Sequence, residues 1–395
     1  MTGMPRIRQI RAYTYRGGGA DYHDQAGYHW IDDHIATPMA RYPAYRASRR
    51  AFGLNVLGTL VVQAEADDGT VGVAVTTGGE PAAWIVERHL ARFAEGAAAS
   101  DLERIWDQMF HATLFYGRKG LALNAISGVD LALWDLLGKL RGEPVHALLG
   151  GPVRDEISFY ATGPRPDLAL EMGFLGGKMP LRHSPADGDR GLAATLAEIE
   201  QMRARTGDDF WLMLDCWMSL TTDYATRLAH RAAGLRLRWL EEPLPPDDYW
   251  GYAELRRRIP PQILLATGEH EATRWGFRML LEMGCADIVQ PDVGWCGGLT
   301  ELLKIAALAE SHGKLVIPHG SSVYSYHFVA TRTSSPFAEF IMMAPQADHI
   351  VPMLTPLLLN EPVPSDGQIK ISALDAPGFG VRLNPACQLD RPFSH

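Results

Sequence analysis

The sequence predicts an α/β protein in which a small α+β unit precedes a (β/α) barrel. The first ~125 residues place strand-like runs before helical ones, whereas the chain after residue 157 alternates short apolar runs with amphipathic segments. Strands that are apolar throughout and alternate with helices are typical of a parallel sheet covered on both faces. Eight such units in about 190 residues favour a closed barrel over an open doubly wound sheet.

The N-terminal unit begins with a hairpin signal. Residues 55–75 hold two apolar runs around an Asp-Asp-Gly turn, a sequence that joins antiparallel strands. A helix is expected over 81–96. A longer one is expected over 124–142, where apolar residues recur at three- and four-residue steps and Gly142 provides a stop.

The barrel strands are short and most end in a charged or polar residue. We expect them at ISFYAT (157–162), GFLGGK (173–178), FWLMLD (210–215), LRWLEE (237–242), QILLATGE (262–269), ADIVQPD (286–292), KLVIPH (314–319) and AEFIMM (338–343). No glycine-rich phosphate-binding motif follows any of them, so nucleotide binding has no support.

Composition excludes several classes of protein. The net charge of −9, without a run of Lys or Arg, argues against nucleic acid as a partner. The N-terminal residues MTGMPRIRQIR lack the apolar core of a signal peptide, and no stretch approaches 18 consecutive apolar residues, so we expect no membrane span. The four scattered cysteines contain no CxxC pair, which favours reduced thiols in a cytoplasmic protein.

An ionisable residue stands at the end of strand after strand. In such a barrel the C-terminal strand ends form the rim that carries the chemistry. The residues are Lys178, Asp215, Glu241, Glu269, Asp292, His319 and Glu339. Three of these acids come from adjacent strands, and carboxylates that converge so closely repel one another unless a cation neutralises them.

Asp215, Glu241 and Glu269 therefore form a candidate metal site. An all-oxygen ligand set favours Mg²⁺, which prefers hard ligands and leaves positions open for water and substrate. The alternative is three separate surface acids, each in its own salt bridge.

Several strand-end motifs resemble those of a known family. They are DCWMS after the third strand, WLEEPLPPDDY after the fourth, ATGEH after the fifth, QPDVGWCGGLT after the sixth and IPHGSSVYS after the seventh. They resemble the enolase superfamily, its mandelate racemase subgroup and, within that subgroup, the L-rhamnonate dehydratases. The resemblance extends from GADYHDQ near the N-terminus to RPFSH at the end of the chain.

The resemblance implies how the chain is divided. It implies an α+β capping domain over 1–145, with a substrate-covering loop at about 18–50, and a (β/α)7β barrel over 146–355. The segment 356–395 is implied to return to the capping domain. A homo-oligomer, with eight subunits, is a further implication.

The resemblance also implies catalytic roles. The three carboxylates match the Mg²⁺ ligands of the family, and His319 matches the base that removes the C2 proton of an acid sugar. Asp292 matches the acid that orients this histidine and raises its basicity, and Glu339 matches the group that hydrogen-bonds the developing intermediate. A proton α to a carboxylate is weakly acidic, so its removal needs a base together with a cation that stabilises the enediolate. The alternative for a lone histidine is a core or surface residue.

The implied reaction is dehydration of L-rhamnonate or a close aldonate, such as L-mannonate or L-lyxonate, to the 2-keto-3-deoxy acid by syn loss of the 3-hydroxyl. Racemases of the subgroup carry Lys-x-Lys on the second strand, whereas this chain has Lys178-Met179-Pro180. Proline cannot act as a base, which disfavours racemisation or epimerisation. We expect Lys178 to point to the other side of the strand, where it either aids the substrate carboxylate or forms a structural ion pair. A non-catalytic sugar-acid sensor is the third alternative.

The segment 19–38 gathers histidines, aspartates and aromatic residues that could be mistaken for a metal site. Its length and composition predict a loop that covers the barrel mouth. By resemblance, His23 in DYHDQ and Arg49 in RASRRAFG bind the substrate. His29 and His34 have no such match, and we interpret them as residues that brace the loop against Asp32 or Asp33. His270, beside Glu269, either supports the site or packs in the core.

Overall fold

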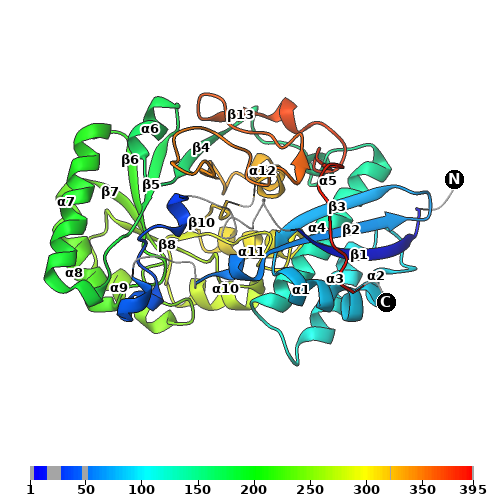
Figure 1. Cartoon of the computed structure of the whole chain (residues 1–395), viewed down its shortest axis with the longest axis horizontal. Helices are drawn as coiled ribbons and strands as arrows, with labels where there is room; N and C mark the ends of the chain where they lie inside the picture. The colour runs from blue at the N-terminus through cyan, green and yellow to red at the C-terminus, as the bar shows by residue number, and fades with distance from the viewer. Residues whose placement is uncertain (1–3, 16–27, 47–51, 321, 394–395) are drawn as a thin grey trace.

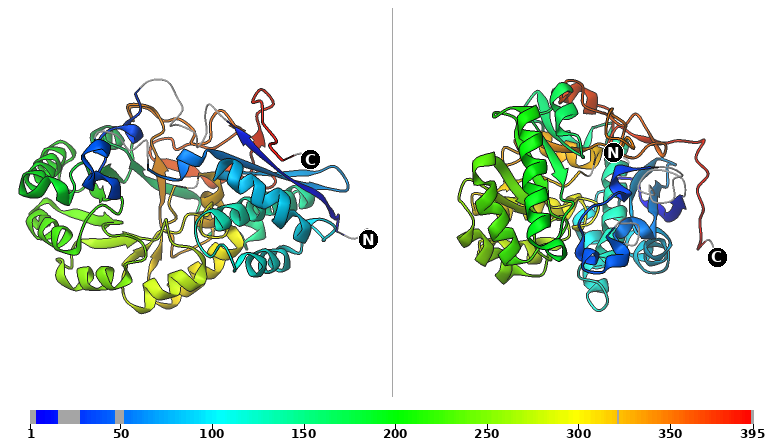
Figure 2. Two further views of the ribbon diagram at one scale, coloured as in Figure 1. Left: turned by 60° about the horizontal axis from the view of Figure 1, so that its bottom comes forward. Right: turned by 60° about the vertical axis from the view of Figure 1, so that its left-hand side comes forward.

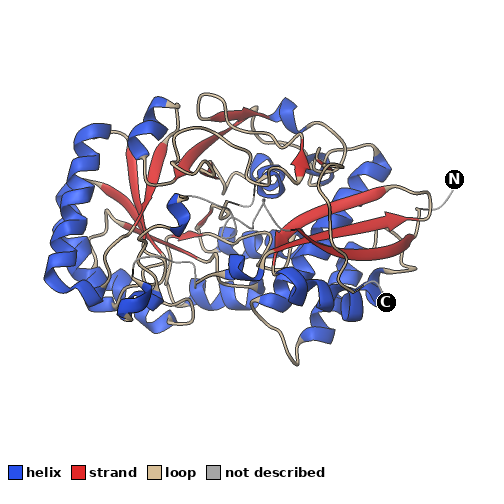
Figure 3. Ribbon diagram, viewed as in Figure 1, coloured by secondary structure: helices blue, strands red, loops and turns tan. Residues whose placement is uncertain are grey.

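The structure is a computed structural model that describes residues 4–15, 28–46, 52–320 and 322–393. Two lobes lie side by side in it (Figure 1). A three-stranded sheet with its helices forms one lobe, and a curled parallel sheet surrounded by helices forms the other (Figure 3). The predicted fold class is confirmed.

The smaller lobe is built on an antiparallel sheet in the order β1-β2-β3. Its strands are β1 (Ile7–Tyr15), β2 (Thr59–Ala66) and β3 (Val71–Thr77). The predicted hairpin is confirmed as β2 and β3, and Gly69 in its turn adopts a φ of 88°, which glycine reaches without strain.

One long helix covers this sheet. The helices of the lobe are α1 (Gly79–Ile85), the π-helical turn η6 (Val86–Leu90), α2 (Ala91–Ala94), α3 (Leu102–Thr113) and α4 (Leu121–Arg141). Helix α4 approaches the sheet so closely that a Cβ on Gly72 would lie 2.1 Å from the Ala132 carbonyl oxygen. Among the described helices, α4 alone has the length and apolarity of a membrane span, but 89% of its most apolar window is buried, which identifies it as a core helix.

The larger lobe contains, within the described residues, eight parallel strands in the order β10-β9-β8-β7-β6-β5-β4-β11. They are β4 (Glu156–Thr162), β5 (Gly176–Pro180), β6 (Trp211–Asp215), β7 (Leu237–Glu241), β8 (Leu264–Thr267), β9 (Ile288–Val289), β10 (Leu315–Val316) and β11 (Ala338–Ile341). All eight predicted strands are present. The last strand, β11, pairs with the first, β4, as the curvature of a barrel requires.

Two of these strands are only two residues long. Pro291 and Pro318 lie two residues beyond the ends of β9 and β10, and proline has no N–H to donate to a ladder. The segments beyond β9 and β10 nevertheless remain hydrogen-bonded to each other: Ile317 N donates to Val289 O at 2.9 Å, and His319 N donates to Pro291 O at 3.2 Å. Irregular backbone therefore carries the predicted catalytic residues of these two strands.

Helices and short turns connect and surround the barrel strands. The α-helices are α5 (Val145–Leu148), α6 (Pro166–Glu171), α7 (Gly188–Thr206), α8 (Thr222–Ala232), α9 (Tyr249–Arg258), α10 (Thr273–Glu282), α11 (Leu299–Ser311) and α12 (Val323–Ala330). The 3₁₀ turns are η2 (Trp30–Asp32), η3 (Pro38–Arg41), η4 (Pro43–Tyr45), η5 (Leu54–Leu57), η7 (Pro185–Asp187), η8 (Ala233–Leu235) and η9 (Ile371–Leu374). The barrel interior is filled by Tyr160, Met213, Trp239, Ala266, Ile288, Ile317 and Phe337.

Both ends of the chain cross from one lobe to the other. The segment that carries η2, η3 and η4 lies on the barrel rim (Figure 2), where Ala36 N donates to Leu181 O, just beyond β5. The tail contains β12 (Leu358–Leu359), β13 (Gln368–Lys370) and β14 (Arg382–Leu383). It then reaches the smaller lobe, where Arg391 Nε lies 2.8 Å from Glu87 Oε1.

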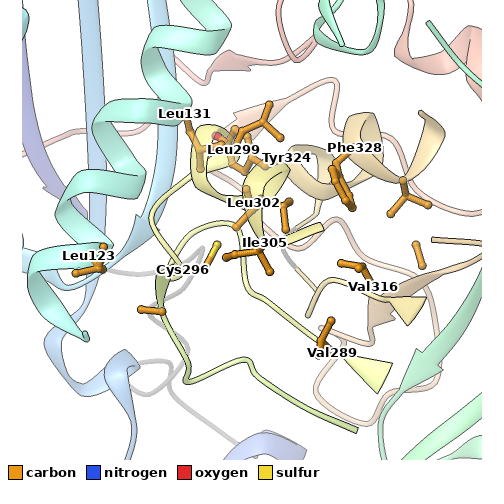
Figure 4. Close-up of a cluster of buried hydrophobic side chains, with 14 of the residues drawn as sticks. Leu123, Leu131, Val289, Cys296, Leu299, Leu302, Ile305, Val316, Tyr324 and Phe328 are labelled. Atoms are coloured by element: carbon orange, nitrogen blue, oxygen red, sulfur yellow. The ribbon is translucent and has the colours of Figure 1, made fainter. Parts of the chain in front are cut away.

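The two lobes share one hydrophobic core. Figure 4 shows Leu123 and Leu131 of α4 in the same cluster as residues of α11 and α12. This continuity holds the loop between β9 and α11 against the smaller lobe.

Candidate active site

The parallel ladders bring the predicted acids to one edge of the barrel. Asp215 and Glu241 are the last residues of β6 and β7 and face each other in register, and Pro180 of β5 is in register with Asp215. Glu269 follows β8, Asp292 follows β9 and His319 follows β10. Because the carboxyl ends of parallel strands meet at one edge, these residues lie on the same rim of the barrel.

Lys178 lies among the acids, and the prediction that it points to the other side of its strand is wrong. Its fully buried ammonium group contacts Glu241 Oε1, lies 2.8 Å from Glu339 Oε1 and lies 3.6 Å from Asp215 Oδ2. Alternate residues of a strand share a face, so Lys178 points the same way as position 180. It is thus a cation inside the site.

The predicted metal ligands are buried acids in a crowded negative environment. Burial raises the pKa of Asp215, and it raises the pKa of Glu241 to about 8 although Lys178 opposes the shift. Burial likewise raises the pKa of Glu269 to about 7, with Glu242 and Asp215 adding repulsion. Oxygen donors whose charge is so poorly compensated fit a divalent cation, which would offset both burial and repulsion.

A second set of possible ligands overlaps the first. Among the residues that the structure describes, one group has ligand atoms that all lie within 4.8 Å of one another, namely Glu242, Glu269 and His270. His270 Nδ1 lies 2.7 Å from Glu242 Oε2 and 3.3 Å from Glu269 Oε1. Glu242 and Glu269 outweigh burial and raise the pKa of His270 to about 9. His270 therefore contacts the site and is more than a packing residue.

A histidine–aspartate dyad stands beside these acids. His319 Nδ1 donates to Asp292 Oδ2 at 2.7 Å, and His319 Nε2 lies 3.4 Å from Glu269 Oε2. Burial alone would lower the pKa of His319, but Glu269 and Asp292 raise it well above its usual value. The indole of Trp295 packs against both imidazoles, with ring centroids 5.3 Å from His319 and 5.6 Å from His270.

Glu339 of β11 is the last of the predicted site residues, and it lies beside Lys178. Its Oε1 accepts from Thr162 Oγ1 and from Lys178 Nζ, and its Oε2 accepts from Gly320 N at 2.9 Å. Burial would raise the pKa of Glu339, but Lys178 and His319 outweigh it and hold the value at about 2. An ionised Glu339 accepts hydrogen bonds only, so it can meet a hydroxyl of a ligand.

Sequence reasoning missed the residues that hold Glu241. Gln290 Nε2 donates to Glu241 Oε2 at 2.7 Å, and Trp239 Nε1 donates to the same oxygen at 3.0 Å. It also missed Glu242, which follows Glu241 and adopts a φ of 39°, a left-handed conformation that is costly for a residue other than glycine. The Glu241-Glu242 pair at the end of β7 shows that a second acid is present there, but nothing around it predicts the left-handed backbone of Glu242.

The predicted covering loop is described in part. His23 and Arg49 lie outside the described residues. His29 holds the chain against the barrel: its Nε2 lies 3.1 Å from Met343 O, beyond β11, and Trp30 Nε1 donates to Met342 O at 2.7 Å. The ring of His34 packs edge-on against His183, with centroids 6.0 Å apart.

Two family models match the chain. The N-terminal domain of mandelate racemase / muconate lactonizing enzyme matches residues 51–150, and the enolase C-terminal domain-like model matches residues 167–387. The second match alone covers more than half of the chain.

Solved structures agree with these matches. Rhamnonate dehydratase from Gibberella zeae, complexed with Mg, is 45% identical, with a TM-score of 0.95 over 98% of this chain and 96% of that one. A racemase from Streptomyces coelicolor A3(2) with bound magnesium is 28% identical, with a TM-score of 0.78 over 95% and 97% of the two chains. The 3,6-anhydro-D-galactonate cycloisomerase from Zobellia galactanivorans is 27% identical, with a TM-score of 0.75 over 96% and 97%. The chain therefore belongs to the mandelate racemase/muconate lactonizing enzyme family of the enolase superfamily.

Proposed function

We propose that the protein is a Mg²⁺-dependent acid-sugar dehydratase that converts L-rhamnonate, or a close aldonate such as L-mannonate or L-lyxonate, to the 2-keto-3-deoxy acid. The observation that carries this proposal is the His319–Asp292 dyad beside the buried acids, with Pro180 at the position where racemases carry a second base. The 45% identity to a rhamnonate dehydratase over nearly the whole chain supports the substrate class.

Asp215, Glu241 and Glu269 are the residues that would hold Mg²⁺. Their buried oxygens suit a hard cation, and the contacts of Gln290 and Trp239 fix one oxygen of Glu241 in place. Bound there, Mg²⁺ supplies positive charge that stabilises the negative charge developing on the substrate carboxylate when the C2 proton leaves.

His319 removes the C2 proton through Nε2, because Nδ1 is engaged by Asp292. The resulting imidazolium is stabilised by Asp292 and donates a proton to the departing 3-hydroxyl on the same face, which gives a syn elimination. The enol product then ketonises. Glu339 and Lys178, which contact each other, bind the oxygens of the substrate, and His270 lines the site beside Glu269.

His23 and Arg49 are proposed to hold the far end of the sugar acid. Their sequence context is the basis for this assignment, and the anchoring of η2 at the barrel rim through Trp30 supports a cover at that position. His23→Ala is expected to raise KM and to change the preference among aldonates while Mg²⁺ stays bound.

The test is a screen of the purified protein with MgCl₂ against a panel of aldonates, with detection of 2-keto-3-deoxy acids. Turnover of L-rhamnonate with the highest kcat/KM is the expected result. Failure to dehydrate any aldonate would contradict the proposal. Epimerised product would favour the racemase alternative, and tight binding of an unchanged aldonate would favour a sensor.

Three further properties belong to this proposal. We infer a cytoplasmic location, which the four free thiols support because three of them are buried without a partner cysteine. We infer a homo-oligomer of eight subunits, and the exposed apolar side chains of Phe115 and Trp250 support association because a partner copy could cover them. We keep the division into 1–145, 146–355 and 356–395 as the domain organisation.

A further inference from the structure

The loop between β9 and α11 carries Asp292 and Trp295, yet much of its support comes from the other lobe. Trp106 Nε1 of α3 donates to Gly297 O at 2.6 Å, and Ser127 Oγ of α4 accepts from Gly297 N at 3.0 Å. Asp130 of α4 accepts from both Thr300 N and Thr300 Oγ1, at 2.9 and 2.6 Å. The smaller lobe therefore anchors the downstream half of this loop and the first turn of α11.

The anchor nearest the dyad is Thr76, the penultimate residue of β3. Its buried hydroxyl donates to Gly294 O at 3.0 Å. Gly294 N in turn donates to Asp292 Oδ1 at 2.6 Å, while Asp292 Oδ2 accepts from His319 Nδ1 at 2.7 Å. Three consecutive hydrogen bonds thus connect the sheet of the smaller lobe to the imidazole of His319.

Gly294 has no room for a side chain between these partners. A Cβ at this position would lie 2.8 Å from Thr76 Oγ1 and 3.1 Å from Asp292 Oδ1. The two peptide groups that flank Gly294 are therefore fixed together, one by Thr76 and the other by Asp292. Loss of the Thr76 hydroxyl would leave the buried carbonyl of Gly294 unpaired and would release the peptide next to the one that donates to Asp292.

We propose that Thr76 is a positioning residue for the Asp292–His319 dyad and that it acts through Gly294 across the boundary between the lobes. This inference rests on the proposed function, since it assigns the dyad as the base. It gives the smaller lobe a part in aligning the base in addition to covering the substrate.

The neighbouring Thr77 offers a matched control. Both threonines are 6% exposed, and both hydroxyls take part in a hydrogen bond. Thr77 Oγ1, however, accepts from Asn124 Nδ2 at 3.0 Å, so its hydrogen bond stays within the smaller lobe. Removing either hydroxyl would lower the stability of the fold in the same way. Only removal of the Thr76 hydroxyl would disturb the alignment of Asp292 and His319.

The kinetic experiment compares Thr76→Val, Thr76→Ser and Thr77→Val with the wild type on L-rhamnonate and Mg²⁺. Valine keeps the shape of threonine and removes the donor. We expect Thr76→Val to lower kcat about tenfold with KM within about twofold, Thr76→Ser to recover most of the loss, and Thr77→Val to stay within about twofold of the wild type. An equal loss in both valine variants, no recovery with serine, or a change in KM alone would overturn the inference.

A second readout does not depend on turnover. In protein labelled with ¹⁵N-histidine, the imidazole signals of His319 are identified by their loss in His319→Asn. We expect Thr76→Val to shift the Nδ1–H signal of His319 and Thr77→Val to leave it in place. If the wild type fails to turn over any aldonate, the proposed function fails, and this comparison still decides the inference: an unchanged His319 signal in Thr76→Val contradicts it.

Discussion

Asp292 Oδ2 and His319 Nδ1 lie 2.7 Å apart at the ends of adjacent strands, and this contact leaves Nε2 as the nitrogen that faces the buried acids. A carboxylate on Nδ1 fixes the tautomer of a histidine and stabilises its protonated form. The pair therefore has the geometry of a general base and its orienting partner.

Substitution of His319 by Asn should abolish catalysis without removing the metal. We expect kcat to fall by a factor of about 10²–10⁴, the usual contribution of general acid–base catalysis. Calorimetric titration should show Mg²⁺ affinity within about threefold of the wild type, since His319 is not a proposed ligand. His312→Asn, on the exposed end of α11, serves as the control and should retain full activity. Loss of Mg²⁺ binding in His319→Asn would mean that the roles are wrongly assigned.

The two overlapping ligand sets give opposite predictions for metal binding. We expect Asp215→Asn to weaken Mg²⁺ binding by about 100-fold, because it removes one of three charged ligands, and His270→Asn to change it by less than about threefold. Isothermal titration after removal of metal with EDTA measures both. If His270→Asn weakened Mg²⁺ binding more than Asp215→Asn did, the cation would lie at Glu242, Glu269 and His270. Activity should disappear with EDTA and return with Mg²⁺.

Lys178 competes electrostatically with a bound cation. Its ammonium contacts Glu241 and lies near Glu339 and Asp215, so Lys178→Met leaves the acids with one positive charge fewer. We expect Mg²⁺ to bind about tenfold more tightly to the variant and kcat to fall. Lys314→Met, at the opposite ends of the strands beside Asp287, is the control. Weaker Mg²⁺ binding in a folded Lys178→Met, checked by circular dichroism, would contradict this role.

A buried histidine away from the site should make the fold sensitive to acid. Burial and the neighbouring His146 lower the pKa of His327 to about 3, and its Nδ1 accepts from His146 N. The unfolded chain takes up a proton near pH 6.5, whereas folded His327 stays neutral until about pH 3, so stability is lost as pH falls through this interval. Between pH 7 and 5 this loss amounts to about 2 kcal/mol.

His327→Gln tests this relationship. The free energy of unfolding of the variant, from urea denaturation, should fall less between pH 7 and 5 than that of the wild type. The ring of His146 stacks on that of His327, with centroids 5.4 Å apart, and His146 Nε2 in turn lies 3.3 Å from the largely exposed Asp375. If the two proteins lost stability equally as the pH fell, the prediction would be contradicted, because His327 would then take up its proton at the same pH in the folded and the unfolded chain.

The barrel strands and the acids at their ends were predictable because each βα unit repeats the same local pattern. The side of β5 that Lys178 faces could also have been predicted. Residues 178 and 180 point to the same face of a strand, and the prediction for Lys178 was wrong because it did not take this alternation into account. The role of Glu242 was not predictable, because the left-handed φ that turns its side chain toward His270 has no local signal.

Contacts between segments far apart in the chain could not be predicted from the sequence. His29 is held by a carbonyl 314 residues away, and Thr76 meets Gly294 across 218 residues. Nothing in the local pattern around Thr76 and Thr77 distinguishes the two, because the difference arises only when β3 packs against the loop after β9. The sequence therefore predicted the acids and the base, and the residues that align them required the structure.

The most direct test of the account is the reaction of L-rhamnonate with the purified protein and MgCl₂ in D₂O, followed by proton NMR. We predict loss of the C2 proton signal together with formation of a 2-keto-3-deoxy acid that carries deuterium at C3. Exchange at C2 without loss of water, or recovery of the aldonate unchanged, would contradict it.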